Sequence, residues 1–425
     1  MLEFSAALQR IVAGAAPRGA IEQTALAEAA GRYLAKDLHA ALAVPGFANS
    51  AMDGYAIRLE DWQPGHSMPV SQRIAAGQQA APLQPGSAAR IFTGAMLPPG
   101  ADCVILQENA QLDAQHSAQH SAMDNAQRVS FRDSPQRGQH IRPAGQDIAL
   151  GSKLASRGQH IDAALLGLLA SAGFARLPCY RALRVAFFST GNELVEPGSD
   201  LAAGQIYNSN RYVLQQLIRD AGAQAIDLGC CADNREATRA LLDRAAASAD
   251  CVISTGGMSV GEEDYVRAEA SDLGEVEFWK IAMKPGKPFA FGTLRDAAFF
   301  GLPGNPVSAF VTFQLLVRPW LLKSMGASSW QQRAMSVAAD FDFTNQGKRV
   351  DFLRGHLRCV TGDDGRAGFA VTLFANQSSG VMSSLVACDV LVPVAAQATV
   401  VAGQSITVLP LAKSAIPGAG VDWPD

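Results

Sequence analysis

Residues 249–306 read ADCVISTGGMSVGEEDYVRAEASDLGEVEFWKIAMKPGKPFAFGTLRDAAFFGLPGNP, and this stretch decides the fold. Its apolar runs at 251–255, 278–283 and 297–302 each lead into a loop rich in glycine, proline and charged residues. Ligands of an open α/β sheet bind beyond the carboxyl ends of the strands, so this pattern predicts that the loops converge on one crevice. A crevice that combines backbone N–H groups, lysines and carboxylates suits a polyanion held with a metal ion.

The first loop joins paired glycines to a run of acidic residues. Gly256 and Gly257 allow successive backbone N–H groups to point at an anion. Gly256 and Gly261 have the spacing of a nucleoside-triphosphate P-loop, but Glu262 stands where that motif needs lysine, which argues against a P-loop. The acidic residues 262–264 also suit the first turn of a helix, where the helix dipole favours negative charge. Both interpretations remain open.

The second and third loops supply cations and free amides. Lys280, Lys284 and Lys287 either clamp phosphate groups as point charges or are simply solvated. Proline on either side of Lys287 stiffens the segment and favours a positioned role for this lysine. In the third loop, Pro306 falls at the first position of a helix with free amides after it, which makes an anion site.

Strands and helices alternate through residues 182–325, which is the signature of a mainly parallel, doubly wound sheet. The predicted strands are 183–189, 225–229 and 250–254, and the predicted helices are 208–221 and 234–247. Glu193, Asp233 and Asp264 each follow a strand or its loop, so we expect them at the same carboxyl edge as the lysines. Three acids facing three lysines predict a metal and anion site.

The flanking segments have a different character. Residues 1–40 show helical spacing and predict two helices, and a helical stretch is also expected after residue 146. Between them, short β runs are predicted, and another β block follows from 334 to 410. The tandem Ala-Gln-His-Ser repeats at 114–121 contain His116 and His120, which lack the partners that a metal site needs. The tail from Lys413 is rich in proline and glycine.

Composition narrows the class of protein. A chain of 425 residues with 48% hydrophobic and 17% charged residues builds about three domains of roughly 100–200 residues. The net charge of −4 gives no general attraction to nucleic acid or to an anionic membrane. Seven cysteines without a CxxC pair indicate a reducing compartment and argue against zinc. The N-terminus lacks the features of a signal peptide, and we expect a cytoplasmic protein.

Nine ordered segments resemble those of the molybdopterin molybdenumtransferases, the family that includes the C-terminal part of gephyrin. The segments are SAMDGYA, FTGAMLPPGADCV, RPAGQD, STGNEL, YNSN, STGGMSVGEEDYV, KIAMKPGKPFAFG, GLPGNPVSAF and FLRG. They extend from about residue 40 to 385, which is nearly the whole chain.

The resemblance implies a multidomain α/β protein in which a doubly wound, mainly parallel sheet domain is joined to a helical linker domain, an inserted β domain and a C-terminal β-barrel. The implied boundaries are 1–44 and 146–180 for the helical linker domain, 45–145 for the inserted β domain, 181–328 for the α/β molybdopterin-binding domain, 329–412 for the C-terminal β-barrel and 413–425 for a flexible tail.

The family inserts molybdate into adenylylated molybdopterin and releases AMP in the presence of a divalent cation, usually Mg²⁺. The resemblance therefore implies a transferase whose substrates are molybdate and adenylylated molybdopterin. It also implies a homodimer with a shared active cleft and a molybdopterin adenylyltransferase as the upstream partner. Two alternatives stay open, namely an adenylyltransferase that consumes ATP and a non-catalytic scaffold like gephyrin.

The residues of the site follow from the matched motifs and their chemistry. Asp53, Thr93, Glu193, Asp233, Asp264, Lys280 and Lys284 are the expected catalytic residues. Glu193 and Asp264 are the expected Mg²⁺ ligands, and Asp53 and Thr93 are expected to close the site of the other subunit. The expected binding residues are Gly256, Gly257, Ser259, Lys287, Pro303, Gly304, Asn305, Pro306, Arg354, Ser378 and Ser379.

Within that set, Arg354, Ser378 and Ser379 are expected on the molybdate side. The sequence departs from the family at two positions. Asn192 stands where relatives often carry Asp, and Ser378 stands where the last loop usually has Gly.

Overall fold

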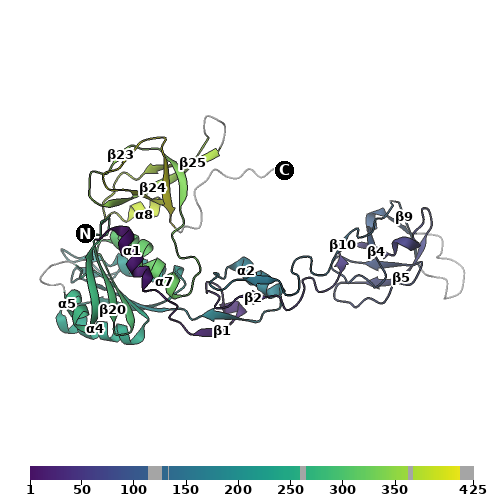
Figure 1. Cartoon of the computed structure of the whole chain (residues 1–425), viewed down its shortest axis with the longest axis horizontal. Helices are drawn as coiled ribbons and strands as arrows, with labels where there is room; N and C mark the ends of the chain where they lie inside the picture. Colours follow the sequence, from purple (N-terminus) through teal and green to yellow (C-terminus); the bar gives the residue numbers. More distant parts are fainter. Residues whose placement is uncertain (113–126, 133, 259–264, 362–366, 412–425) are drawn as a thin grey trace.

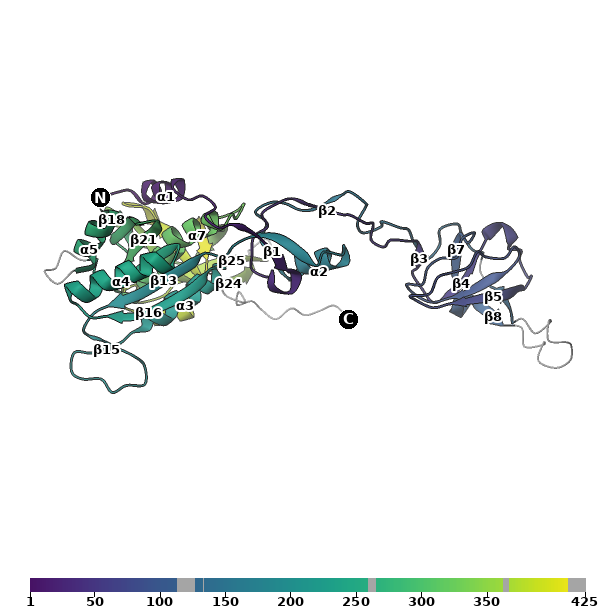
Figure 2. The same cartoon turned by 90° about the horizontal axis from the view of Figure 1, so that it is seen from below.

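A computed structural model of the chain describes residues 1–112, 127–132, 134–258, 265–361 and 367–411. The molecule is elongated (Figure 1). The α/β domain and the C-terminal β domain lie together at one end, and the inserted β domain lies at the other end of a thin connecting region. The view from below shows the same separation (Figure 2).

The α/β domain is built on a six-stranded sheet with the order β16-β13-β17-β21-β20-β18. The first four strands are parallel, and β20 and β18 run antiparallel to their neighbours. The strands are β13 (Arg184–Thr190), β16 (Gln224–Cys231), β17 (Cys251–Thr255), β18 (Gly274–Lys280), β20 (Pro288–Leu294) and β21 (Ala297–Leu302). Each of the central strands β17 and β21 is buried along its whole length, as expected of a sheet covered on both faces.

Helices cover both faces of this sheet. They are α3 (Ser209–Asp220), α4 (Arg235–Ser248), α5 (Tyr265–Leu273), α6 (Pro306–Thr312) and α7 (Arg318–Ser324), with a π-helical segment, Phe313–Val317, between the last two. Asn208 and Asn234 cap α3 and α4 by accepting hydrogen bonds from backbone N–H groups in the first turn. The doubly wound sheet predicted from the alternation of strands and helices is confirmed.

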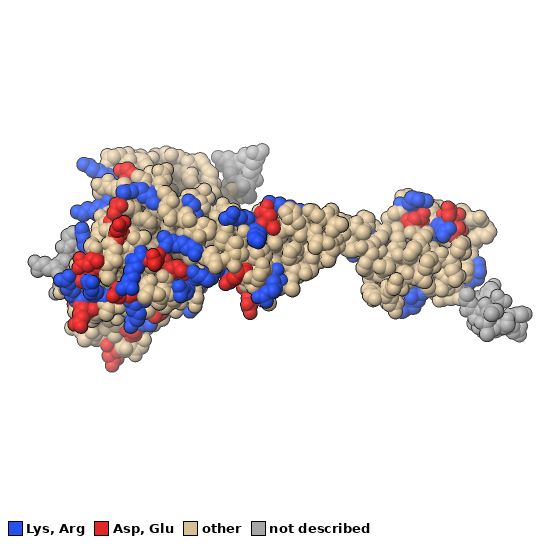
Figure 3. All heavy atoms as spheres, turned by 60° about the horizontal axis from the view of Figure 1, so that its bottom comes forward, with Lys and Arg blue, Asp and Glu red and all other residues tan. Residues whose placement is uncertain are grey.

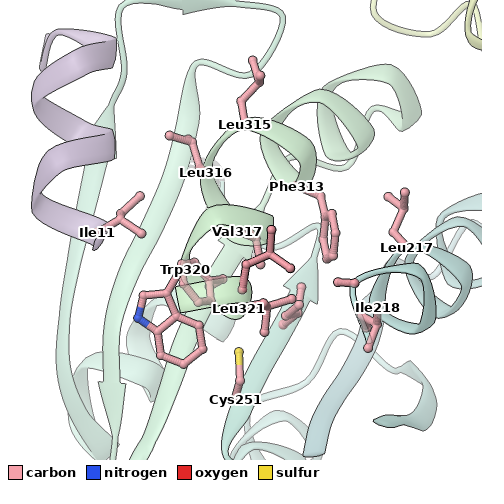
Figure 4. Packing of buried hydrophobic residues seen from close by; sticks show 14 of the residues in the cluster. Ile11, Leu217, Ile218, Cys251, Phe313, Leu315, Leu316, Val317, Trp320 and Leu321 are labelled. Atoms are coloured by element: carbon pink, nitrogen blue, oxygen red, sulfur yellow. The ribbon is translucent and has the colours of Figure 1, made fainter. Parts of the chain in front are cut away.

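The first helix belongs to the core of the α/β domain. Helix α1 (Phe4–Ala13) buries Ala7 and Ile11, and Ile11 lies in one cluster with Trp320 of α7 and Ile218 of α3 (Figure 4). The expected assignment of the first 44 residues to the linker domain is therefore wrong for α1. Amphipathic spacing alone predicts a helix but does not say which core its apolar face joins.

The connecting region contains more strand than the sequence predicted. The second helix expected within residues 1–40 is instead the strand β1 (Ile21–Ala25), followed by a short 3-10 turn at Leu26–Glu28. Strand β1 pairs with β12 (Arg176–Tyr180) in antiparallel register, because cross-strand pairing overrides a weak helical pattern. The region also contains β2 (Leu38–His39), β11 (Lys153–Ala155) and one helix, α2 (Ala163–Ser171).

The inserted β domain is a six-stranded sheet with the order β7-β4-β6-β5-β9-β8. Its strands are β4 (Gly54–Ile57), β5 (Met68–Ile74), β6 (Ala88–Ile91), β7 (Cys103–Leu106), β8 (Ala110–Leu112) and β9 (Arg128–Phe131), with 3-10 turns at Leu59–Asp61 and Gln107–Asn109. A narrow ribbon of β3 (Asn49–Ser50) and β10 (Ile141–Arg142) connects it to the rest of the chain. The insertion of a β domain into the linker segment, as predicted, is what makes the molecule long.

The C-terminal domain is a closed five-stranded barrel. Strands β24, β25, β22, β28 and β26 pair in that order, and β24 also pairs with β26 to close the circle. Their bounds are β22 (Met335–Ala339), β24 (Val350–Thr361), β25 (Ala367–Leu373), β26 (Val390–Val394) and β28 (Ser405–Pro410), with α8 (Ser383–Ala387) and the pair β23 (Phe343–Thr344) and β27 (Thr399–Val400). The predicted barrel is thus confirmed.

One short strand joins the barrel to the α/β domain. Strand β19 (Met283–Lys284) leaves the edge of the large sheet and pairs with β24, opposite Val350 and Asp351. The barrel is therefore attached beside the loops at the carboxyl edge of the large sheet. Charged side chains of both signs are interspersed over the α/β domain, while the narrow connection to the inserted domain shows few on the face in Figure 3.

Candidate functional site

A pocket of about 900 Å³ lies at the carboxyl edge of the large sheet. Loops after β13, β17 and β21 form three of its walls, and the 284–288 turn and the barrel loop at 377–379 form the others. Its lining includes Thr190, Gly191, Glu193, Asn210, Asp233, Thr255, Gly256, Gly257, Lys284, Lys287, Pro303, Gly304, Asn305, Pro306, Ser308, Arg349, Gln377, Ser378 and Ser379. Most of the residues predicted for the site are brought together here.

The acidic end of the pocket follows β13 and β16. The Asp233 carboxylate accepts a hydrogen bond from the Asn192 backbone N–H at 3.0 Å, and the Asn192 side-chain oxygen accepts one from the Asp233 N–H at 3.3 Å. These reciprocal bonds fix the two loops against each other. The exposed Glu193 carboxylate has no hydrogen bond or ion pair with any residue that the structure describes, so it is available to a ligand.

The opposite end of the pocket is cationic. The Lys284 ammonium lies 3.3 Å from the Asp351 carboxylate, whose side chain is only 6% exposed while that of Lys284 is 52% exposed. Arg349 donates a 3.4 Å hydrogen bond to the Met283 carbonyl. Lys287 is exposed and, among the described residues, has no ion pair. Three cations therefore line this end, and Asp351 neutralises only one of them.

Glycine is required where the β17 loop meets the β13 loop. Gly256 has a φ of +84°, and a Cβ there would lie 2.6 Å from the Thr190 carbonyl oxygen. Any larger residue would push the two loops apart. Nearby, Asn210 of α3 donates a 2.7 Å hydrogen bond to the Gly304 carbonyl and so holds the 303–306 turn in the wall of the pocket.

The barrel loop is tied to the start of α6. The Asn305 side-chain amide donates to the Ser379 hydroxyl at 3.1 Å, and the Val307 N–H donates to the Ser379 carbonyl at 3.1 Å. Helix α6 begins at Pro306, as predicted, but the first amide after it is not free for an anion, because the Val307 N–H is donated to Ser379. Ser378 and Ser379 line the pocket as a consequence of this docking.

Arg354 has a different place from the one expected. Its side chain is 1% exposed and does not line the pocket. The guanidinium donates to the Ser384 hydroxyl at 3.1 Å and to the Ser378 carbonyl at 3.0 Å, and burial lowers its pKa. A direct molybdate contact by Arg354 is not what the structure shows, because the side chain is used behind the loop to hold it.

Lys280 also lies outside the pocket. It borders an adjoining recess of about 550 Å³ on the other side of Lys287 and Pro288, with Met258, Arg267 and Trp279. Lys280 ends the edge strand β18 opposite Pro288, so Lys287 and Pro288 lie between it and the pocket. Ser259 and Asp264, together with His116 and His120, lie outside the described residues.

Asp53 and Thr93 lie in the inserted domain, which is at the opposite end of the molecule from the pocket (Figure 1). The Thr93 backbone N–H and hydroxyl both donate to one Asp53 carboxylate oxygen at 2.8 Å. Both hydrogen bonds lower the pKa of Asp53, and the bond from the backbone N–H has the larger effect. Thr93 is exposed and Asp53 is half-buried, but a single chain does not bring the pair to its own pocket.

Several residues of the site were not predicted from the sequence, and three of them are polar or charged residues with a clear role. Arg349 and Asn210 line the pocket, and Asp351 anchors Lys284. Asn210 stands in the YNSN segment and Asp351 directly precedes FLRG, so motif membership was the available signal. Nothing in the local sequence indicated that the barrel strand β24 lies beside β19.

The donor set fits a magnesium ion. Mg²⁺ usually takes one or two carboxylates and completes its shell with water and substrate phosphates. Glu193 offers a free carboxylate beside Asp233, which matches that requirement. Among the described residues there is no cluster of three or more His, Cys, Asp and Glu that would form an all-protein cage.

Together these features define a class of protein: an α/β enzyme that handles anions at the carboxyl edge of its sheet, with a barrel docked over one side of the pocket. Three family profiles match consecutive parts of the chain. They are described as MoeA N-terminal region (domain I and II) at residues 2–173, probable molybdopterin binding domain at 186–323, and MoeA C-terminal region (domain IV) at 336–411. The chain belongs to the molybdopterin molybdenumtransferase family, and it is a transferase.

The similarity extends over most of each relative. A molybdopterin molybdenumtransferase of Haemophilus influenzae is 43% identical over 332 residues, covering 78% of this chain and 80% of the relative. One from Nostoc is 37% identical over 343 residues, covering 78% and 76%. A crystal structure of a molybdopterin biosynthesis MoeA protein from Pyrococcus horikoshii has a TM-score of 0.77 at 25% identity, covering 97% of this chain and all of that one. In the described part of this chain, none of the helices has the length and apolarity needed to span a membrane.

Proposed function

We propose that this protein inserts molybdenum from molybdate into molybdopterin, with adenylylated molybdopterin as the substrate and AMP as the released product. The observation that carries the proposal is the polarity of the pocket, which has free carboxylate at one end and three cations at the other. The names of the curated relatives support the same reaction.

The order of strands explains this polarity. Asp233 follows β16 and Glu193 follows β13, whereas Lys287 precedes β20 at the other side of β17 and β21. Neighbouring strands lie about 4.8 Å apart, so the acids and the cations occupy separate regions along one edge. A metal-bound phosphate anhydride fits the acidic region, and the molybdate oxyanion fits the cationic region.

The residues of the pocket would have different roles according to their charge. Glu193 would hold Mg²⁺ with Asp264 as the proposed second ligand, and Asp233 would orient the water that accompanies the ion. When bound, Mg²⁺ neutralises the negative charge of the anhydride. Lys284, Lys287 and Arg349 would bind and orient molybdate. The Gly256–Gly257 turn would approach the phosphate groups, and Ser378 and Ser379 would close the barrel side. Charge positioning of this kind, rather than a strong base, is what oxyanion transfer requires.

We further propose that two copies assemble so that Asp53 and Thr93 of one complete the pocket of the other. The support is geometric, since Asp53 and the exposed Thr93 are joined by two hydrogen bonds and are remote from the pocket of their own chain. A molybdopterin adenylyltransferase would supply the adenylylated substrate.

The test is an assay of AMP release from adenylylated molybdopterin. We expect release to require both molybdate and Mg²⁺, and to stop with a chelator. Incubation with ATP and molybdopterin should give no pyrophosphate, whereas an adenylyltransferase would produce it. Absence of molybdate-dependent AMP release by the purified dimer would refute the proposed reaction and favour a scaffold.

A further inference from the structure

The inserted domain carries a concentration of positive charge outside the pocket described above. Arg73 of β5 and Arg90 of β6 are register partners in adjacent strands. Their guanidinium carbons lie 4.4 Å and 4.5 Å from the centre of the same ring, that of Phe92. Like charges directly opposite each other destabilise a strand pair, so the arrangement needs compensation.

Neither arginine has an ion pair with a carboxylate among the described residues. Arg90 donates to the Gly54 carbonyl at 2.8 Å and to the Gln107 side-chain oxygen at 2.6 Å, and both acceptors are uncharged. Arg73 is exposed, and its recorded partner is the Phe92 ring. By contrast, Arg58 and Arg137 of the same domain each pair with a carboxylate at 3.1 Å. Arg73 is thus positioned by an aromatic ring and left free to meet an anion, whereas Arg90 is also held by hydrogen bonds and has no ion pair with a carboxylate among the described residues.

The two arginines line a recess of about 480 Å³. Tyr55, Val70 and Leu112 contribute apolar surface to it, and the amides of Gln107 and Gln127 contribute hydrogen-bonding groups. A concave site with an apolar floor and convergent cations suits an anionic group joined to a flat ring. Arginine is especially suited to phosphate, because its planar fork can form two parallel hydrogen bonds.

The recess adjoins the Asp53–Thr93 pair. Arg90 lies opposite Tyr55 in the sheet register and its guanidinium holds the carbonyl of Gly54, the residue after Asp53. Arg90 also lowers the pKa of Asp53 through its charge, after the two Thr93 hydrogen bonds. A molecule that approaches Asp53 therefore comes within electrostatic reach of Arg90, which is the register partner of Arg73.

We propose that Arg73 and Arg90 form a phosphate-binding subsite, occupied by the adenylylated substrate that lies in the pocket of a second copy of this chain. This inference rests on the proposed function and names residues of the inserted domain that would contact the substrate. The pocket of one chain provides carboxylates at its anhydride end, and the arginines of the other chain provide the cations that this end lacks.

Arg73→Gln is the sharpest single test, because its guanidinium has no hydrogen bond to lose among the described residues. We expect the KM for adenylylated molybdopterin to rise about 10- to 100-fold, as for loss of a charge-assisted hydrogen bond, while the KM for molybdate stays unchanged. Arg73→Lys should recover part of the loss by keeping the charge. Arg137→Gln, which removes an exposed paired arginine of the same domain, is the matched control and should leave both KM values unchanged.

A subunit-mixing experiment tests whether the subsite acts in the other copy. Arg73→Glu and Lys284→Met chains, each inactive alone, are unfolded or dissociated together and reassembled. If Arg73 serves the partner's pocket, each mixed dimer contains one intact site, and about a quarter of wild-type activity returns on random pairing in a two-fold dimer. If it serves the pocket of its own chain, every site carries a defect and no activity returns.

The outcomes separate this inference from the proposed function. A wild-type enzyme that loads molybdenum, with an Arg73→Gln variant of unchanged substrate KM, overturns the subsite alone. A variant that instead fails to dimerise by sedimentation shows that Arg73 pairs with an acidic side chain of the partner, which also overturns it. A wild-type chain without molybdate-dependent AMP release refutes the proposed function itself.

Discussion

Lys284 has the most informative single side chain of the pocket. A buried carboxylate, Asp351, holds it from below, while half of the lysine side chain remains exposed toward the ligand space. This arrangement fixes the ammonium without neutralising it fully. An exposed lysine without such a partner would not be held in one position and would contribute little to the binding of an anion.

Lys284→Met should reduce molybdenum insertion about 10²- to 10³-fold, the usual effect of removing a group that stabilises developing charge. The measurement is molybdate-dependent AMP release at saturating adenylylated substrate. Lys348→Met, at a neighbouring exposed lysine outside the pocket lining, is the control and should retain full activity. Full activity in the Lys284 variant would remove this residue from the site.

Thr93→Val should shift the pH dependence of the reaction. The Thr93 hydrogen bonds favour the ionised Asp53 and hold its folded pKa below the ordinary value. The ionised form is therefore present above that folded pKa and is lost as the pH falls through it. Removal of the hydroxyl raises the pKa of Asp53, so the acidic limb of the pH–rate profile should move to higher pH.

Thr93→Ser keeps the hydroxyl and should restore the original profile. The pKa of Asp53 itself can be followed by carboxyl NMR in both variants. An acidic limb that does not move, despite a raised pKa of Asp53, would show that ionised Asp53 is not needed for the reaction.

At the scale of elements, the barrel loop is held in the site by a series of contacts from both domains. Strand β24 holds Arg354, Arg354 holds the Ser378 carbonyl, and Ser379 is bonded to the start of α6. Among the described residues, the buried Arg354 guanidinium has only uncharged hydrogen-bond partners, and such burial is costly. Here it holds one loop at the boundary between two domains.

Arg354→Met should loosen this loop rather than remove a ligand contact. We expect a lower melting temperature and a raised KM for molybdate, with the KM for the adenylylated substrate less affected. Arg358→Met is the matched control, since Arg358 lies on the same strand but forms an exposed ion pair with Asp340, and exposed pairs contribute about 0–1 kcal/mol. An equal loss in both variants would argue against a specific role of Arg354.

At the scale of the whole molecule, the inserted domain is attached as a separable unit. The chain enters and leaves it at adjacent points, because the Gly145 N–H donates to the Pro45 carbonyl at 2.9 Å and Val44 pairs with Ile148. Its hydrophobic clusters contain none of the core residues of the α/β domain.

Replacement of residues 46–144 by a short glycine-serine turn should therefore leave the α/β domain and the barrel folded. The expected protein melts cooperatively and still binds molybdate, but it no longer releases AMP because Asp53 and Thr93 are absent. Circular dichroism and a binding titration measure the two properties. Loss of the folded α/β core in this variant would show that the inserted domain is needed for folding.

Much of this protein follows from its sequence. The apolar runs after residue 182 determined the doubly wound sheet, since strands buried on both faces leave a near-continuous hydrophobic pattern. The loops after them determined Glu193, Asp233, Lys284 and the glycine turn as one site, because parallel strands end at a common edge.

Tertiary structure decided the rest. It placed α1 in the α/β core and turned residues 21–25 into a strand, because distant partners outweigh weak local preferences. It buried Arg354 behind its own loop and placed Lys280 in a neighbouring recess. It also brought Asp351 under Lys284, because β24 of the barrel pairs with β19. Local sequence encodes which residues end a strand, but the packing between domains determines which side chains face the ligand.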